Sequence, residues 1–290
     1  MNINGMLSED TFKGKVVLIT GGGTGLGKSI GEYILKLGGK IIITSRREEV
    51  IEKTAGTFNA AYPSSTLGIA GDVRKIEDVE NVINEGFKEF NQIDMLINNA
   101  AGNFISPTER LSANAFSVII DIVLKGTCNY TLTLGKKWIK QKHSGTILNI
   151  TTTYALTGSG YVIPSAAAKG GVLTFTKSIA AEWAKYKIRC NAVAPGPFPT
   201  EGAWSRLVPP GFSKFFDIKK RIPLKRVGEH QELANLCAYL LSDYSGYITG
   251  EVVTIDGGEW MYNAGQFSWL DKVPSAMWTI IEKTIRKKSK

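Results

Sequence analysis

The 290-residue chain has few of the residues that metal sites, disulfide frameworks and histidine-dependent catalysis need. Its three cysteines, Cys128, Cys190 and Cys237, are scattered and odd in number. They form no pair at zinc-ligand spacing, so we expect no metal site and treat them as reduced, buried side chains. The two histidines, His143 and His230, lie among polar residues. We expect both to be exposed and neither to be catalytic.

Long apolar runs are also missing, so we expect no membrane insertion. The first ten residues have no basic start, no apolar stretch of signal length and no arginine. This pattern predicts a cytoplasmic protein, or one of the mitochondrial matrix if a presequence has been removed. The net charge of +9 brings nucleic-acid binding into consideration, but the basic residues are dispersed and accompany no nucleic-acid module. A small polyanionic ligand explains the excess more simply.

The chain is rich in short, β-branched apolar runs that alternate with helical stretches. The runs predict strands at 16–20, 40–44, 67–70, 95–98, 146–151, 189–194 and 252–255. The clearest helical periods cover 27–37, 76–90, 115–139, 167–183 and 232–241. This alternation favours right-handed crossovers. The expected fold is a single α/β domain over 1–290, with one doubly wound, Rossmann-type parallel sheet of about seven strands and helices on both faces.

The first predicted strand runs into a glycine-rich turn and then into a helix. The turn consists of Gly21, Gly22, Gly23, Thr24, Gly25 and Leu26. In this context the backbone N–H groups point at one position near the positive end of the helix dipole. Glycines also let a pyrophosphate approach the backbone closely. The sequence therefore predicts that these six residues bind a dinucleotide.

If the dinucleotide is a nicotinamide cofactor, the end of the second predicted strand indicates which one it is. A carboxylate usually holds the ribose diol of NADH at this point, but here the strand is followed by Ser45, Arg46 and Arg47. Guanidinium groups make charge-assisted, often bidentate contacts with phosphate oxygens. We therefore expect NADPH, with Arg46 as the main phosphate contact. The alternative is that both arginines are solvated charges at the start of the next helix.

Two segments interrupt the alternation of strands and helices. Residues 201–225 contain Pro209, Pro210 and Pro223 among aromatic and basic residues. A long insertion after the carboxyl end of a strand usually covers a ligand. Residues 261–290 add a loop and a short helix, which would serve as an oligomer contact or a lid.

Five motifs in order make the chain similar to the short-chain dehydrogenases/reductases from about residue 13 to about residue 260. They are Thr20-Gly21 with Gly25 and Gly27; Asp72-Val73; Asn98-Asn99-Ala100-Ala101-Gly102; Asn191 with Pro195-Gly196 and Thr200; and Ile255-Asp256-Gly257-Gly258. The resemblance implies that Asp72 contacts the adenine and that Pro195, Gly196, Pro197 and Phe198 cover the nicotinamide. It also implies a homotetramer.

The chain departs from the carbonyl-reducing members of that family in the catalytic tetrad. Those enzymes place an acidic tyrosine four residues before a lysine, whereas Ser165 precedes Lys169 here. Thr152 stands for a serine of the tetrad and Val123 for its asparagine. A serine hydroxyl is far too weak an acid to replace the tyrosine unaided. The usual acid for a carbonyl group is therefore missing.

Reduction of a conjugated alkene remote from a thioester carbonyl would not need that acid. Hydride would enter at the distal carbon, and the negative charge would appear on the thioester oxygen several bonds away. The donors that stabilise this oxygen must then lie elsewhere. Tyr154 follows the fifth predicted strand and Asn103 follows the fourth, at the edge where such sheets bind ligands. Their phenol and carboxamide could donate two hydrogen bonds to an enolate.

Residues 99–112, 121–124, 151–169 and 195–198 and the tail resemble one group of the family, the mitochondrial-type 2,4-dienoyl-CoA reductases, which share Ser165 and Val123. The resemblance implies that Tyr154 is catalytic with Asn103 beside it, and that Lys169 binds the cofactor. It implies acyl-CoA contacts by Arg46, Arg74, Phe104, Ser112 and Arg206, with Arg46 shared with the cofactor. The basic residues of 219–226 are further candidates for the coenzyme A phosphates.

The implied reaction is the NADPH-dependent reduction of trans-2,4-dienoyl-CoA to trans-3-enoyl-CoA in the β-oxidation of unsaturated fatty acids, with a proton from water or from Tyr154. Two alternatives stay open. One is an NADPH-dependent carbonyl or trans-2-enoyl-CoA reductase with a rearranged acid, for which Tyr161 is the candidate. The other is a non-enzymatic NADPH-binding sensor. Single residues also have structural alternatives. Tyr154 could be a buried tyrosine whose hydroxyl bonds to the backbone, Asn103 could cap or turn the loop after the fourth strand, and Asp72 could be a turn residue at a strand end.

Overall fold

The computed structural model describes residues 7–200 and 217–288, in which seven strands form one parallel sheet. The strands are β1 (Val16–Thr20), β2 (Lys40–Ser45), β3 (Thr66–Ala70), β4 (Met95–Asn98), β5 (Gly145–Ile150), β6 (Ile188–Pro195) and β7 (Val252–Ile255). Their order is β3-β2-β1-β4-β5-β6-β7, and every neighbouring pair is parallel. The predicted doubly wound sheet is confirmed, and each strand agrees with its predicted range to within one residue at either end.

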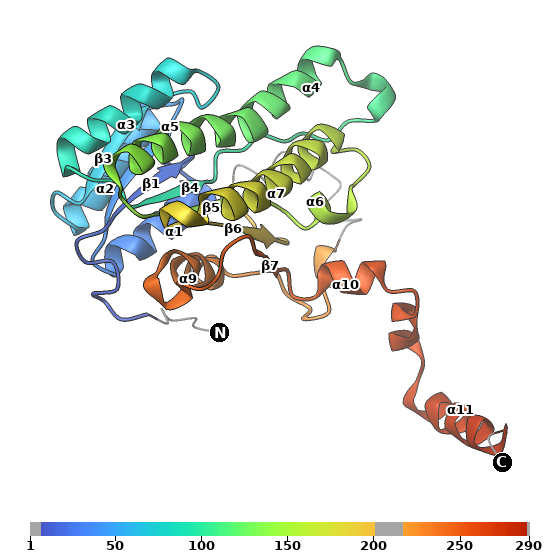
Figure 1. Cartoon of the computed structure of the whole chain (residues 1–290). Helices are drawn as coiled ribbons and strands as arrows, with labels where there is room; N and C mark the ends of the chain where they lie inside the picture. The colour runs from blue at the N-terminus through green and yellow to red at the C-terminus, as the bar shows by residue number, and fades with distance from the viewer. Residues whose placement is uncertain (1–6, 201–216, 289–290) are drawn as a thin grey trace.

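Helices cover both faces of the sheet (Figure 1). One face packs against α1 (Gly25–Lys36), α2 (Glu48–Ala61) and α9 (His230–Leu241), and the other against α3 (Ile76–Phe90), α5 (Gly126–Gln141) and α7 (Ile163–Trp183). Val17 and Ile19 of β1 belong to the first core, and Val16 and Leu18 belong to the second. Successive side chains of a strand point to opposite faces, so covering both faces buries every residue of β1. This is why the strands appear as continuous apolar runs in the sequence.

The long helix predicted over 115–139 is divided. It consists of α4 (Ala113–Ile120), a π-helical segment η2 (Asp121–Lys125) and α5. Val123 of η2 is fully buried in a small core with Ala168 and Val172 of α7. π-helical turns are frequent at functional sites. This one packs on the helix that carries Ser165 and Lys169.

The remaining described elements are short or lie in the C-terminal tail. They are η1 (Thr108–Arg110), α6 (Tyr154–Thr157), η3 (Ala184–Tyr186), η5 (Ile218–Arg221), η6 (Asp243–Ser245), α10 (Glu259–Ala264), η7 (Ser268–Lys272) and α11 (Ser275–Lys288). The tail was expected to hold one short helix. It forms α10, η7 and α11 instead and extends away from the sheet in Figure 1.

The helical stretch 113–141 is long and apolar enough to cross a membrane by length and composition alone, contrary to the expectation from uninterrupted apolar runs. In this fold its residues Tyr130, Leu134 and Trp138 are buried in the core beneath α5. The Trp138 indole N–H also donates to the carbonyl of Ile93 at 2.6 Å. Because 33% of its most apolar window is buried, packing over the sheet accounts for only part of its apolar character.

Candidate active site

The turn between β1 and α1 has the geometry of a phosphate-binding turn. Gly21 and Gly25 have φ values of 66° and 55°, which other residues adopt only with strain. A Cβ on Gly27 would lie 2.5 Å from the carbonyl oxygen of Gly21, so only glycine lets α1 start so close to the turn. Thr24 precedes α1 and makes no side-chain cap within the described structure. The first N–H groups of α1 are therefore suited to an anionic ligand.

The loop after β4 is fixed to this turn by hydrogen bonds. The Asn99 side chain donates to the carbonyls of Thr20 and Gly21 at 3.0 and 3.1 Å. The Thr20 hydroxyl accepts from the backbone N–H groups of Asn99 and Ala100, each at 3.0 Å. These bonds hold the loop that carries Asn103 against the glycine turn, which explains physically why the two motifs occur together.

Tyr154, Asn103 and Ser165 meet at the carboxyl edge of the sheet. Tyr154 opens the one-turn helix α6 just after β5. Asn103 Nδ2 donates to Tyr154 Oη at 3.2 Å, and Ser165 Oγ lies 3.1 Å from the same oxygen. The Asn103 carboxamide is oriented by its own Oδ1, which accepts from the Phe104 N–H at 2.9 Å. The structure thus brings the two predicted donors together and adds Ser165, which the sequence marked only as the place of the missing tyrosine.

Lys169 lies one helical turn after Ser165 and is 6% exposed. Its Nζ donates to the carbonyl of Ile150 at the end of β5. Burial disfavours the charged ammonium and lowers the pKa of Lys169 to about 8. The charged and neutral forms are therefore equally populated near pH 8, and the remaining N–H groups of the amine are available to a ligand.

Asp72 and Arg74 were expected to contact different ligands, but the structure pairs them. Arg74 Nη2 lies 2.5 Å from Asp72 Oδ2, and Arg74 Nε lies 2.9 Å from Oδ1. The hydrogen bonds from Arg74 hold the pKa of Asp72 below its usual range, and the charge of Arg46 adds to this effect. Next to Arg46, the buried hydroxyl of Ser45 has no partner among the described residues. This corner therefore combines one carboxylate, two guanidinium groups and a hydroxyl without a partner in the described structure.

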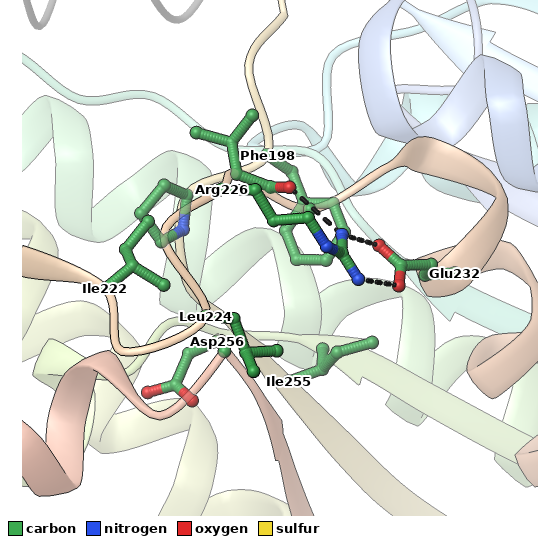
Figure 2. Close-up of a pocket in the computed structure, with 11 residues that line it drawn as sticks. Phe198, Ile222, Leu224, Arg226, Glu232, Ile255 and Asp256 are labelled. Atoms are coloured by element: carbon green, nitrogen blue, oxygen red, sulfur yellow. Dashed lines mark hydrogen bonds and ion pairs between the residues drawn. The ribbon is translucent and has the colours of Figure 1, made fainter. Parts of the chain in front are cut away.

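The loop after β6 packs over a cavity of about 90 Å³ at the ends of β6 and β7 (Figure 2). Phe198, Ile222, Leu224, Arg226 and Asp256 are among its lining residues. The Arg226 guanidinium donates to both carboxylate oxygens of Glu232, at 2.7 and 2.6 Å. This ion pair joins the segment before α9 to α9 itself, and both residues line the cavity beneath the loop that is expected to cover the nicotinamide.

The residues predicted to contact acyl-CoA lie in different parts of the structure. Phe104 packs beside the small core that contains Val123. The Ser112 hydroxyl accepts from the Ala115 N–H at 3.1 Å and caps α4, so it has a structural role in starting that helix. Arg206 lies outside the described residues. Within the basic cluster, Arg226 is paired with Glu232, and Arg221 lies 3.7 Å from Glu259.

The expectation that both histidines are exposed is wrong. Both are partly buried. His143 Nε2 lies 3.2 Å from the Asp94 carboxylate, and His230 bridges Ser29 and Pro199. Polar neighbours along the chain suggested exposure, but the contacts that bury these rings come from residues distant in the sequence.

Tyr161, the alternative acid, lies outside the phenol–carboxamide cluster. Its side chain is 64% exposed and its φ is 65°. Its carbonyl accepts from the Ser106 N–H at 2.9 Å, which joins two loops at the rim of the site. Within 7–200 and 217–288, no group of three or more His, Cys, Asp or Glu side chains could hold a metal ion.

A glycine turn, a buried lysine and a strand-end tyrosine on a doubly wound sheet define an oxidoreductase that uses a nicotinamide cofactor. The family model described as Enoyl-(Acyl carrier protein) reductase matches residues 21–259. The chain belongs to the short-chain dehydrogenase/reductase family.

Several relatives are named for one activity. A probable 2,4-dienoyl-CoA reductase of Caenorhabditis elegans, described as (3E)-enoyl-CoA-producing, is 42% identical over 90% of this chain and 85% of its own length. A probable 2,4-dienoyl-CoA reductase of Bacillus subtilis, described as (2E)-enoyl-CoA-producing, is 40% identical over 85% of this chain and 97% of its own length. A short chain dehydrogenase crystal structure from Bacillus anthracis has a TM-score of 0.76 at 41% identity, covering 85% of this chain and 96% of that one. The resemblance to dienoyl-CoA reductases is confirmed.

Proposed function

We propose that this chain is an NADPH-dependent 2,4-dienoyl-CoA reductase. The observation that carries the proposal is the 3.2 Å contact between Asn103 Nδ2 and Tyr154 Oη. These two donors come from the segments after β5 and β4, not from position 165 on α7, where carbonyl reductases of the family keep their acid; Ser165 Oγ lies 3.1 Å from the phenol oxygen. Donors must lie where charge develops, and in a dienoyl thioester the charge develops several bonds away from the carbon that receives hydride.

When bound, NADPH would supply the hydride, which enters at the δ-carbon of the diene. The residues of this chain then act on the thioester oxygen. The Tyr154 hydroxyl and the second N–H of Asn103 can both donate to it. The bond from Asn103 to Tyr154 Oη strengthens the phenol as a donor, because hydrogen bonds in a chain polarise one another. Arg46 and Lys169 would hold the cofactor at its phosphate and ribose ends.

The position of the proton decides the product. Protonation of the dienolate at its α-carbon gives trans-3-enoyl-CoA, and protonation at its γ-carbon gives trans-2-enoyl-CoA. The two named relatives are described as forming different products. We propose that the dienolate is protonated at its α-carbon, by water or by Tyr154. We also propose that the enzyme acts in the β-oxidation of unsaturated fatty acids and that it is a homotetramer.

The direct test mixes the protein with NADPH and 2,4-hexadienoyl-CoA and follows the loss of dienoyl absorbance, with mass spectrometry and chromatography of the product. We expect turnover and trans-3-enoyl-CoA. Tight NADPH binding without turnover would instead favour a sensor, for which the loss of the usual tyrosine at Ser165 is the supporting feature. Turnover confined to ketones or 2-enoyl-CoA would favour the rearranged reductase.

Replacing Arg46 by alanine is expected to lower the preference for NADPH over NADH. Hydrogen bonds to charged groups contribute about 1.5–3 kcal/mol, so we expect the ratio of kcat/KM values for the two cofactors to fall by about 10- to 100-fold. Arg47→Ala, one residue away, is the matched control and should keep the ratio. An unchanged ratio in Arg46→Ala would contradict the assignment of Arg46 to the phosphate.

A further inference from the structure

His230, at the start of α9, joins two parts of the site that are distant in sequence. Its Nδ1 lies 2.8 Å from Ser29 Oγ on α1, and its Nε2 lies 2.9 Å from the carbonyl oxygen of Pro199. A carbonyl oxygen can only accept, so Nε2 must carry a proton. In the neutral ring Nδ1 then accepts from the Ser29 hydroxyl, for which the Gly25 carbonyl oxygen at 3.2 Å is a second and more distant acceptor. The imidazole therefore uses both nitrogens and is fixed from two sides.

The carbonyl that His230 holds belongs to the loop 195–200, which begins at Pro195, the last residue of β6. At its far end, the methyl group of Thr200 would lie 3.3 Å from a Cβ on Gly25, so the loop touches the glycine turn. The Gly228 N–H donates to the Pro197 carbonyl at 3.0 Å. A Cβ on Gly228 would lie 2.3 Å from the Phe198 ring, so that ring sits directly on the backbone. Gly228 and His230 thus contact this loop at two points, and His230 links it to α1.

We propose that His230 is a positioning residue that holds the loop 195–200 over the nicotinamide cofactor. Ser29 lies within the first turns of α1, so the imidazole couples the loop to the helix whose N-terminus faces the cofactor phosphates. Without it, the Pro199 carbonyl loses its partner and cofactor binding must order the loop, which weakens binding. The inference rests on the proposed role of this loop and not on the dienoyl substrate.

Three substitutions separate the two contacts of the ring. His230→Ala removes both. The amide of His230→Asn falls near the position of Nδ1 and can reach Ser29 but not Pro199. The amide of His230→Gln extends to the position of Nε2 and can donate to Pro199. Gln231→Ala, the next residue on α9, removes a bond to Asn235 at 3.0 Å and serves as the control.

The measurement is the Kd of NADPH, from fluorescence titration of each purified variant. One net hydrogen bond is worth about 0.5–1.5 kcal/mol, so Ala and Asn should weaken binding by about 2- to 10-fold. Gln and the Gln231→Ala control should stay within about twofold of the original protein. The kcat at saturating NADPH should change little, because neither ring contact involves Tyr154 or Asn103.

A second readout needs no cofactor and no substrate. Backbone hydrogen exchange of 196–200 in the cofactor-free protein should be faster in the Ala and Asn variants than in the Gln variant. Equal Kd and exchange in all variants would overturn the proposal. The proposal would also be overturned if His230→Gln weakened NADPH binding and His230→Asn did not, because the contact with Ser29 would then be the important one. Failure of the dienoyl-CoA assay would leave both readouts intact.

Discussion

Replacing Tyr154 by phenylalanine is expected to lower kcat for 2,4-dienoyl-CoA by about 100- to 1,000-fold, the usual cost of losing one oxyanion donor. The phenol oxygen lies 3.2 Å from Asn103 Nδ2 and 3.1 Å from Ser165 Oγ, so the hydroxyl is held in place before substrate arrives. Phenylalanine keeps the ring and removes only the donor. Its effect should therefore appear in kcat and kcat/KM alike, while the Kd of NADPH stays unchanged.

The control for this experiment is Tyr161→Phe. Tyr161 is the other phenol near the site, but it is 64% exposed and lies at the rim. We expect its variant to turn over 2,4-hexadienoyl-CoA nearly as fast as the original protein, measured under the same steady-state conditions. The reverse result, with Tyr161→Phe inactive and Tyr154→Phe active, would move the acid to Tyr161 and support the rearranged reductase.

The fold could be predicted because both faces of the sheet are covered. Val16, Val17, Leu18 and Ile19 are all buried, so an interior strand such as β1 stands out as an apolar run whichever way its side chains point. The break in the helix over 113–141 could not be predicted in this way. Its apolar period continues through Val123, and the π-helical turn becomes visible only where Val123 packs against Ala168 and Val172 of α7.

The residues of the candidate site also fall into those that the sequence could predict and those that it could not. The glycine turn, Tyr154, Asn103 and Lys169 each follow a predicted strand or occupy a fixed helical spacing, so the sequence places them at one edge. The Asp72–Arg74 pair is local and could have been anticipated from its two-residue spacing. The contacts of Ser165 with Tyr154 and of His230 with Pro199 join different elements. Helical spacing from Lys169 was the only signal for Ser165, and nothing in the sequence indicated that His230 is bridged.

Lys169→Met is expected to weaken NADPH binding by about 10- to 100-fold at pH 7, because a charge-assisted hydrogen bond is worth about 1.5–3 kcal/mol. The pKa of Lys169 is about 8, so the ammonium predominates at pH 7 and is lost as the pH rises through that value. The charge-assisted bonds weaken with it. The Kd of the original protein should therefore rise between pH 7 and pH 9, whereas that of Lys169→Met should change less. Parallel pH profiles would contradict a role for this amine in holding the cofactor.

The lowered pKa of Lys169 also predicts how the stability of the cofactor-free protein depends on pH. Stability should rise with pH, whereas the affinity for NADPH should fall. Its pKa is about 8 in the folded state and near 10.5, the ordinary value, in the unfolded state. Between these values the unfolded chain binds more protons, so the contribution of Lys169 to the free energy of unfolding rises with pH, by up to about 1.4 kcal/mol per unit. The cost of burying the ammonium is present in full below pH 8 and is relieved as the pH rises toward 10.5. In urea unfolding, the stability of the original protein relative to Lys169→Met should increase by about 1 kcal/mol from pH 7.5 to pH 9. A constant difference would show that the lysine keeps an ordinary pKa in the fold. The loss of NADPH affinity above pH 8 would then need another titrating group.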